Sequence, residues 1–349
     1  MKMARLSRKL VARAAAGLDR AVTFAVRVAL PIPDDDPHLG IGHEERVAGL
    51  RAAVERLKSL ELAGFFPEPR VIEPLERSRG RHGGQERSDL SWSSLEAPFF
   101  PELEERFRAT HQNGVALARC FTRGSGRPVA ILVHGYLLGQ LAVEQYVWPI
   151  AELDALGFDS AVLILPFHGR RADPLHTGRP DFPGRDPLFA SEGFRQAVTD
   201  LRELANFLRR RGHAKVGAFG MSLGAYTAAL AATVDPSFDF LIPIVPLASL
   251  ADFALEHGEL PEAPEPRAVE YALLEEVYRF VSPVHRPPLI APERTLVLGA
   301  RSDRITRFSH ARRLASHFHA ELVAFEGGHV LQWGLGSAFP KVAALLKRI

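Results

Sequence analysis

A serine between two glycines is the first feature of this sequence that could carry out covalent chemistry. Gly220-Met221-Ser222-Leu223-Gly224 matches the pattern G-x-S-x-G, in which a tight turn from a strand into a helix presents the serine hydroxyl. We expect the two glycines to crowd each other, so that neither position tolerates a Cβ atom. An apolar stretch at 215–219 and an alanine-rich stretch at 225–233 supply the strand and the helix. Ser222 is therefore the predicted nucleophile, and a tight turn with a structural serine is the alternative.

A general base for this serine is predicted near the end of the chain. His329 follows the apolar stretch 321–325 and two glycines, in the run Glu326-Gly327-Gly328-His329. An imidazole titrates near neutral pH, and a loop after a strand can direct it toward a nucleophile. The glycines before it allow the chain to turn. A histidine of a surface loop is the alternative interpretation.

The acid of the set is predicted at Asp303. It closes the run Gly299-Ala300-Arg301-Ser302-Asp303, after the predicted strand 295–300. A carboxylate there can hold the imidazole in one tautomer and stabilise the imidazolium. The resulting order along the chain is serine, acid, histidine, which is the order found with nucleophilic serines in G-x-S-x-G turns. Asp252 is the rival acid, because it also follows a predicted strand, at 240–245, although at a greater distance.

Main-chain amides are predicted to hold the negative charge that develops on the substrate oxygen. The apolar strand 129–133 ends in His134-Gly135-Tyr136-Leu137, and a glycine there lets the backbone approach a substrate. We expect the N–H groups of Tyr136 and Leu223 to form the oxyanion hole, with Leu137 as the runner-up for the first. His134 is predicted to brace the loop by hydrogen bonds rather than to act as a base.

The elements that must position these residues alternate between strand and helix from about residue 114. This alternation predicts an α/β fold with a doubly wound, mostly parallel sheet. In such sheets the chemistry lies in loops at the carboxyl ends of strands, which is where each candidate residue falls. Residues 1–100 are predicted to form a helical N-terminal extension, with 78–92 as a loop or linker. Residues 101–349 are the predicted catalytic domain, and 247–292 a lid or cap insertion.

Residues 1–30 contain seven basic side chains and one acid, Asp19, among many apolar residues. This pattern predicts a basic amphipathic helix. Such a helix either lies on an anionic membrane or packs on the domain with its basic face solvated. The formal net charge of +2 gives no reason to expect nucleic acid as a partner. With the single Cys120 and no long apolar run, we predict a cytoplasmic protein, with peripheral membrane contact through residues 1–30 as the alternative to a packed helix.

Four motifs together resemble the α/β-hydrolase superfamily over about residues 110–349. They are HGY at 134–136, GMSLG at 220–224, GARSD at 299–303 and GGH at 327–329. The resemblance implies a Ser-His-Asp hydrolase of the carboxylesterase kind, acting on a small ester-like molecule without a metal or an organic cofactor. The run PFHGRR at 166–171 is similar to a segment of dienelactone-hydrolase-like and prolyl-peptidase-like members. A peptidase or amidase with the same triad, or an acyltransferase, is the alternative.

Charged side chains after the predicted strand 160–166 allow two further interpretations. His168, Asp173 and His176 fit no strong metal-ligand spacing. Arg170, Arg171 and Arg179 either attract an anionic substrate group or belong to a solvated basic loop. No metal site is predicted.

Overall fold

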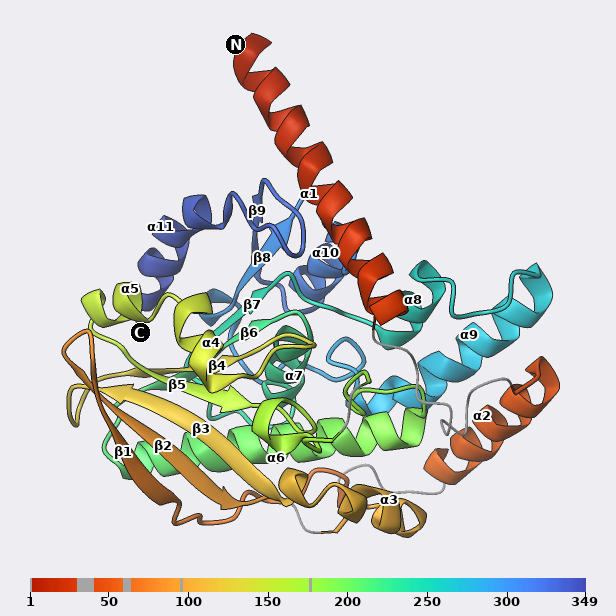
Figure 1. Ribbon diagram of the computed structural model, residues 1–349, viewed down its shortest axis with the longest axis horizontal. Helices are drawn as coiled ribbons and strands as arrows, with labels where there is room; N and C mark the ends of the chain where they lie inside the picture. The colour runs from red at the N-terminus through yellow and green to blue at the C-terminus, as the bar shows by residue number, and fades with distance from the viewer. Residues whose placement is uncertain (1, 30–40, 59–63, 95–96, 176–177) are drawn as a thin grey trace.

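A nine-stranded sheet lies at the centre of the computed structural model, which describes residues 2–29, 41–58, 64–94, 97–175 and 178–349 (Figure 1). The strand order is β1-β2-β3-β5-β4-β6-β7-β8-β9. The strands are β1 (Leu75–His82), β2 (Gln85–Ser93), β3 (Val115–Thr122), β4 (Val129–Val133), β5 (Asp159–Ile164), β6 (Val216–Met221), β7 (Leu241–Ile244), β8 (Leu296–Ala300) and β9 (Glu321–Phe325).

Six neighbouring strands, from β5 to β9 in the sheet order, are parallel, and β1, β2 and β3 extend the sheet in antiparallel fashion. The apolar run of β4 shows why both faces must be covered. Val129, Ile131 and Val133 pack into the core on one face, and Ala130 and Leu132 into the core on the other. The predicted doubly wound, mostly parallel sheet is therefore confirmed.

Helices on the two faces complete these cores. The face lined by Ile131 carries α6 (Pro187–Arg210), α7 (Leu223–Ala231) and α10 (Phe308–His317). The opposite face, lined by Leu132, carries α4 (Leu141–Val147), α5 (Ile150–Ala155) and α11 (Leu335–Leu346).

Two helix boundaries differ from the prediction for local reasons. The sequence predicts a single helix over 140–156, but Pro149 cannot continue a helix, and α4 and α5 lie on either side of it. The sequence also predicts a long helix over 191–211 from its apolar face. This helix begins earlier, at Pro187, because the Asp186 carboxylate caps the amides of Leu188 and Phe189.

The prediction of a loop or linker over 78–92 is wrong, because β1 and β2 form a hairpin there. Gly83 and Gly84 make its turn with φ of 55° and 86°, the backbone that a two-residue hairpin loop requires. β2 then pairs with β3 along its length. The strand is polar, and the buried Asp89 is balanced by Arg79 and Arg119. The first hundred residues therefore add two strands to the sheet besides their helices.

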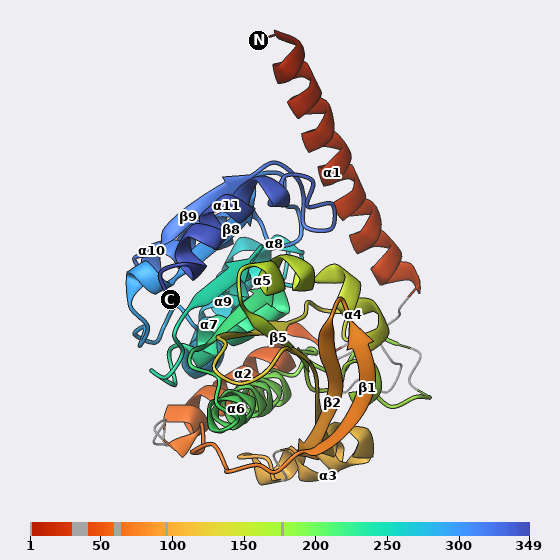
Figure 2. The same cartoon turned by 90° about the vertical axis from the view of Figure 1, so that its left-hand side faces the viewer.

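The long helices of the N-terminal region are α1 (Lys2–Ala29) and α2 (His43–Lys58). The N-terminal half of α1 projects beyond the rest of the molecule in both views (Figures 1 and 2). α2 packs on α9 (Pro264–Tyr278), where His43 and Arg46 both contact the buried Glu270. The run PIPDDDP at 31–37 is predicted to break the first helix, because proline and an acid cluster stop helical propagation. These residues lie outside the described part of the chain.

The segment 247–292 contains α8 (Leu250–Glu256) and α9. Its role as a lid or cap stays a prediction, as does the division of the chain into an extension and a catalytic domain. Among the described residues, no helix combines the length and the apolar character needed to cross a membrane.

Candidate active site

Ser222 occupies a strained turn between β6 and α7. Its φ of 54° and ψ of −113° are rare for a residue other than glycine, and such strain is held in place by the surrounding structure. The Ser222 N–H donates a hydrogen bond to the carbonyl of Ile244 at 3.0 Å. This bond ties the turn to the end of the neighbouring strand β7. The serine therefore lies at the carboxyl edge of the parallel strands.

The glycines of the motif are required by close contacts on both sides of the turn. A Cβ atom on Gly220 would lie 2.2 Å from the carbonyl oxygen of Gly224. A Cβ atom on Gly224 would lie 2.0 Å from the carbonyl oxygen of Val133, at the end of β4. Gly220 thus crowds Gly224 as expected, whereas Gly224 is needed for a different reason, its approach to β4.

The loop after β4 lies directly against the predicted nucleophile. A Cβ atom on Gly135 would be 3.4 Å from the Cβ atom of Ser222. Within the part of the chain that the structure describes, the amides of Tyr136, Leu137 and Leu223 donate to no acceptor. Leu223 also begins α7, where the amides of the first turn point out of the helix. These amides are available to bind an anionic oxygen.

His134 braces this loop, and the prediction of that role is confirmed. Its Nδ1–H donates to the Gly135 carbonyl at 2.8 Å, and its Nε2 accepts a hydrogen bond from the Leu165 N–H at 3.0 Å. Burial lowers the pKa of His134 to about 3, so the ring is neutral and both nitrogens are occupied. A second brace, which sequence reasoning missed, is Glu144, whose carboxylate accepts the Gly139 N–H at 2.7 Å.

The segment 166–169 packs against the same loop. A Cβ atom on Gly169 would lie 2.1 Å from the carbonyl oxygen of Gly139. The buried His168 donates from Nδ1 to the Pro166 carbonyl at 2.8 Å, and burial lowers its pKa to about 4. This segment therefore supports the loop after β4. His176 lies outside the described residues.

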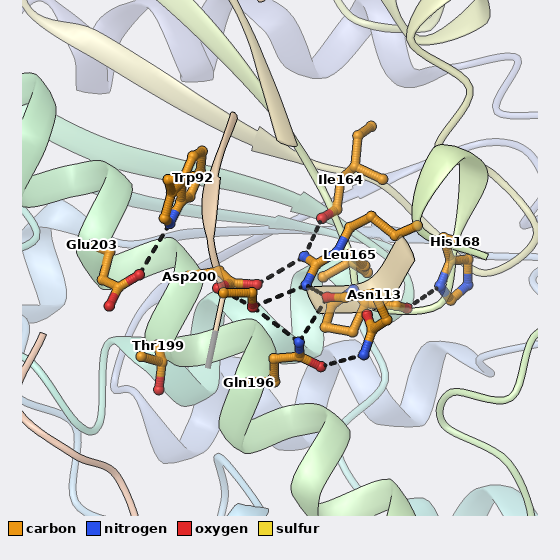
Figure 3. Close-up of polar contacts among 12 residues, drawn as sticks. Trp92, Asn113, Ile164, Leu165, His168, Gln196, Thr199, Asp200 and Glu203 are labelled. Carbon is orange, nitrogen blue, oxygen red and sulfur yellow. Dashed lines mark hydrogen bonds and ion pairs between the residues drawn. The ribbon is translucent and has the colours of Figure 1, made fainter. Parts of the chain in front are cut away.

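Arg171 is buried, so it neither belongs to a solvated basic loop nor attracts an anionic substrate group. Its guanidinium pairs with Asp200 at 2.8 Å and donates to the carbonyls of Ile164 and Asn113. In Figure 3, Gln196 of α6 is hydrogen-bonded to Asn113. Asp200 of the same helix points toward the guanidinium. The Asn113 side chain accepts the Phe167 N–H at 3.0 Å, so this network fixes the chain just before His168.

Asp303 and His329 form a hydrogen-bonded pair. The distance between His329 Nδ1 and Asp303 Oδ2 is 2.8 Å. The other oxygen of Asp303 accepts the main-chain N–H groups of Ile305 and Thr306, each at 2.8 Å. Because Asp303 takes up the Nδ1–H, Nε2 of the imidazole is left to accept a proton. Among the described contacts, no hydrogen bond joins His329 to the Ser222 hydroxyl.

Asp252, the rival acid, is engaged elsewhere. Its carboxylate accepts a hydrogen bond from the Tyr271 hydroxyl at 2.7 Å and pairs with Arg313. Tyr271 lies on α9 and Arg313 on α10. No contact of Asp252 with His329 occurs among the described residues.

Two residues beside the Asp303–His329 pair were missed by sequence reasoning. The Thr306 hydroxyl lies 3.0 Å from His329 Nδ1. Asp19 of α1 is fully buried, and its carboxylate accepts main-chain hydrogen bonds from Arg304, His329 and Val330. In the sequence, Asp19 only interrupts a basic helix, and nothing nearby in the chain indicates its partners.

Comparisons with known proteins agree with this architecture. No family model matches the chain. In sequence it is 29% identical over 294 residues to the uncharacterized protein Rv2627c of Mycobacterium tuberculosis (strain ATCC 25618 / H37Rv), covering 82% of this chain and 70% of that protein. In structure it is similar to acetyl xylan esterase 1 from Thermoanaerobacterium sp. JW/SL YS485, with a TM-score of 0.56, 15% identity, and 87% of this chain and 94% of that chain covered.

The alpha/beta hydrolase GrgF from Penicillium sp. sh18 is a further similar structure, with a TM-score of 0.50 and 15% identity, covering 75% of this chain and 98% of that chain. The chain has the α/β-hydrolase fold, as its four motifs predicted.

Proposed function

We propose that this chain is a serine hydrolase that cleaves a carboxylic ester through an acyl-enzyme on Ser222. The observation that carries the proposal is the 2.8 Å pair between His329 and Asp303, together with a strained Ser222 on the same edge of the sheet. A similar fold in acetyl xylan esterase 1 makes an ester the first substrate class to test.

In the first half of the proposed reaction, His329 Nε2 takes the proton of the Ser222 hydroxyl while the Ser222 oxygen bonds to the carbonyl carbon. The amides of Leu223 and Tyr136 stabilise the oxyanion, each contributing roughly 3 kcal/mol. His329 then gives its proton to the alcohol oxygen as the C–O bond breaks.

In the second half, water attacks the acyl carbon and gives its proton to His329. The bond between the acyl carbon and the Ser222 oxygen then breaks as His329 gives this proton to the serine oxygen, and the carboxylic acid leaves. Asp303 holds the imidazole in one tautomer throughout and stabilises the imidazolium.

A fluorophosphonate probe and a panel of p-nitrophenyl esters test the proposal. We expect the native protein to be labelled and to hydrolyse esters, and Ser222→Ala to lose both properties. Labelling that survives Ser222→Ala would contradict the nucleophile assignment. Amides, thioesters and added acceptor alcohols belong in the panel, because the same triad serves a peptidase, an amidase or an acyltransferase; faster turnover of an amide would replace the ester proposal.

A further inference from the structure

The buried Asp19 carboxylate connects α1 to both loops of the Asp303–His329 pair. Its Oδ2 accepts the His329 N–H at 2.8 Å and the Arg304 N–H at 3.0 Å, and its Oδ1 accepts the Val330 N–H at 3.0 Å. Arg304 is the residue next to Asp303. One side chain therefore fixes the backbone on either side of the 2.8 Å pair.

The same carboxylate explains why the residue before His329 is a glycine. A Cβ atom on Gly328 would lie 2.6 Å from Asp19 Oδ2, so this position needs glycine for Asp19 to approach. Asp19 itself is 0% exposed, and hydrogen bonds from main-chain amides compensate its charge.

From these contacts we propose that Asp19, on α1, is a positioning residue. It holds the backbone of His329 and the backbone next to Asp303 so that the two side chains can form their hydrogen bond. The kinetic part of this proposal rests on the proposed function. Misplacing a catalytic group by about 1 Å is enough to lower turnover roughly a hundredfold. Removal of the carboxylate is thus expected to reduce kcat and leave substrate binding nearly unchanged.

The test compares Asp19→Ala and Asp19→Asn with Thr23→Val, which changes α1 at a side chain whose hydroxyl donates to the Asp19 main-chain carbonyl. On a p-nitrophenyl ester, we expect kcat to fall roughly ten- to a hundredfold in Asp19→Ala, less in Asp19→Asn, and KM to stay within about twofold. Gly328→Ala places a methyl group against the Asp19 carboxylate without altering α1. It should lower kcat as Asp19→Ala does. Unchanged kcat, or a loss confined to KM, would overturn the proposal.

Amide hydrogen exchange tests the positioning role of Asp19 without relying on ester hydrolysis. Asp19→Asn should lose amide protection at 301–306 and 327–331 and retain it in the central strands. If the native protein hydrolyses no ester, the proposed function has failed, and exchange decides the positioning by itself. Equal exchange in the native protein and in Asp19→Asn would then overturn it.

Discussion

The Thr306 hydroxyl donates a hydrogen bond to the main-chain carbonyl of Val245 at 2.9 Å. Val245 has a φ of 42°, which is strained for a β-branched residue. The same hydroxyl oxygen lies 3.0 Å from His329 Nδ1. When its proton is directed at Val245, the oxygen can share the Nδ1–H with Asp303. The hydroxyl also lies 3.1 Å from Asp303 Oδ2, so Thr306 contacts both members of the Asp303–His329 pair.

This relationship predicts that Thr306→Val lowers kcat. Loss of one hydrogen bond at the imidazole should cost about 1 kcal/mol, or roughly fivefold in rate. Thr306→Ser keeps the hydroxyl and is the control, expected to retain most of the activity. Steady-state hydrolysis of a p-nitrophenyl ester measures both, and equal rates for the two variants would contradict the prediction.

The two candidate acids predict opposite results. Asp303→Asn should lower kcat by roughly a thousandfold or more, because the amide favours the wrong imidazole tautomer. Asp252→Asn should leave kcat within about threefold, because its partners are Tyr271 and Arg313. Both variants are compared by the same ester assay, and a larger loss from the change at Asp252 would reverse the assignment.

The close approach of Gly224 to β4 predicts a loss of stability on substitution. Gly224→Ala places a methyl group 2.0 Å from the Val133 carbonyl oxygen and should cost at least about 1–3 kcal/mol of unfolding free energy. Gly336→Ala in α11 has open space around it and should gain up to about 1 kcal/mol. Urea unfolding measures both changes, and an equal effect at the two sites would argue against crowding.

Stability is predicted to fall in acid through the buried His168. Its pKa is about 4 in the folded chain and 6.5 as the ordinary value, so the unfolded chain binds the proton first. The free energy of unfolding therefore has its full value above pH 6.5, and it decreases as the pH falls from 6.5 toward 4. Between about pH 7 and pH 5 this one group should cost about 2 kcal/mol of unfolding free energy.

Urea unfolding at the two pH values checks this, with His168→Gln expected to show the smaller dependence. His111→Gln changes an exposed histidine and should behave like the native protein. An identical pH dependence in His168→Gln and the native protein would refute the role of His168.

The strand and helix periodicities, and the four motifs, were sufficient to predict the parallel sheet and the places of Ser222, Asp303 and His329 after its strands. They work because apolar runs and turn glycines are local properties. The polar hairpin β1–β2 was missed, since its strands are stabilised by partners elsewhere, such as Arg119 for Asp89.

The sequence by itself therefore determined which residues could do the chemistry and the fold that carries them. Only the tertiary structure decided that Asp303 rather than Asp252 meets His329, and that Asp19 holds the backbone of His329 across 310 positions of the chain. The physical reason is that such hydrogen bonds depend on packing between distant elements, and no local pattern of residue types records them.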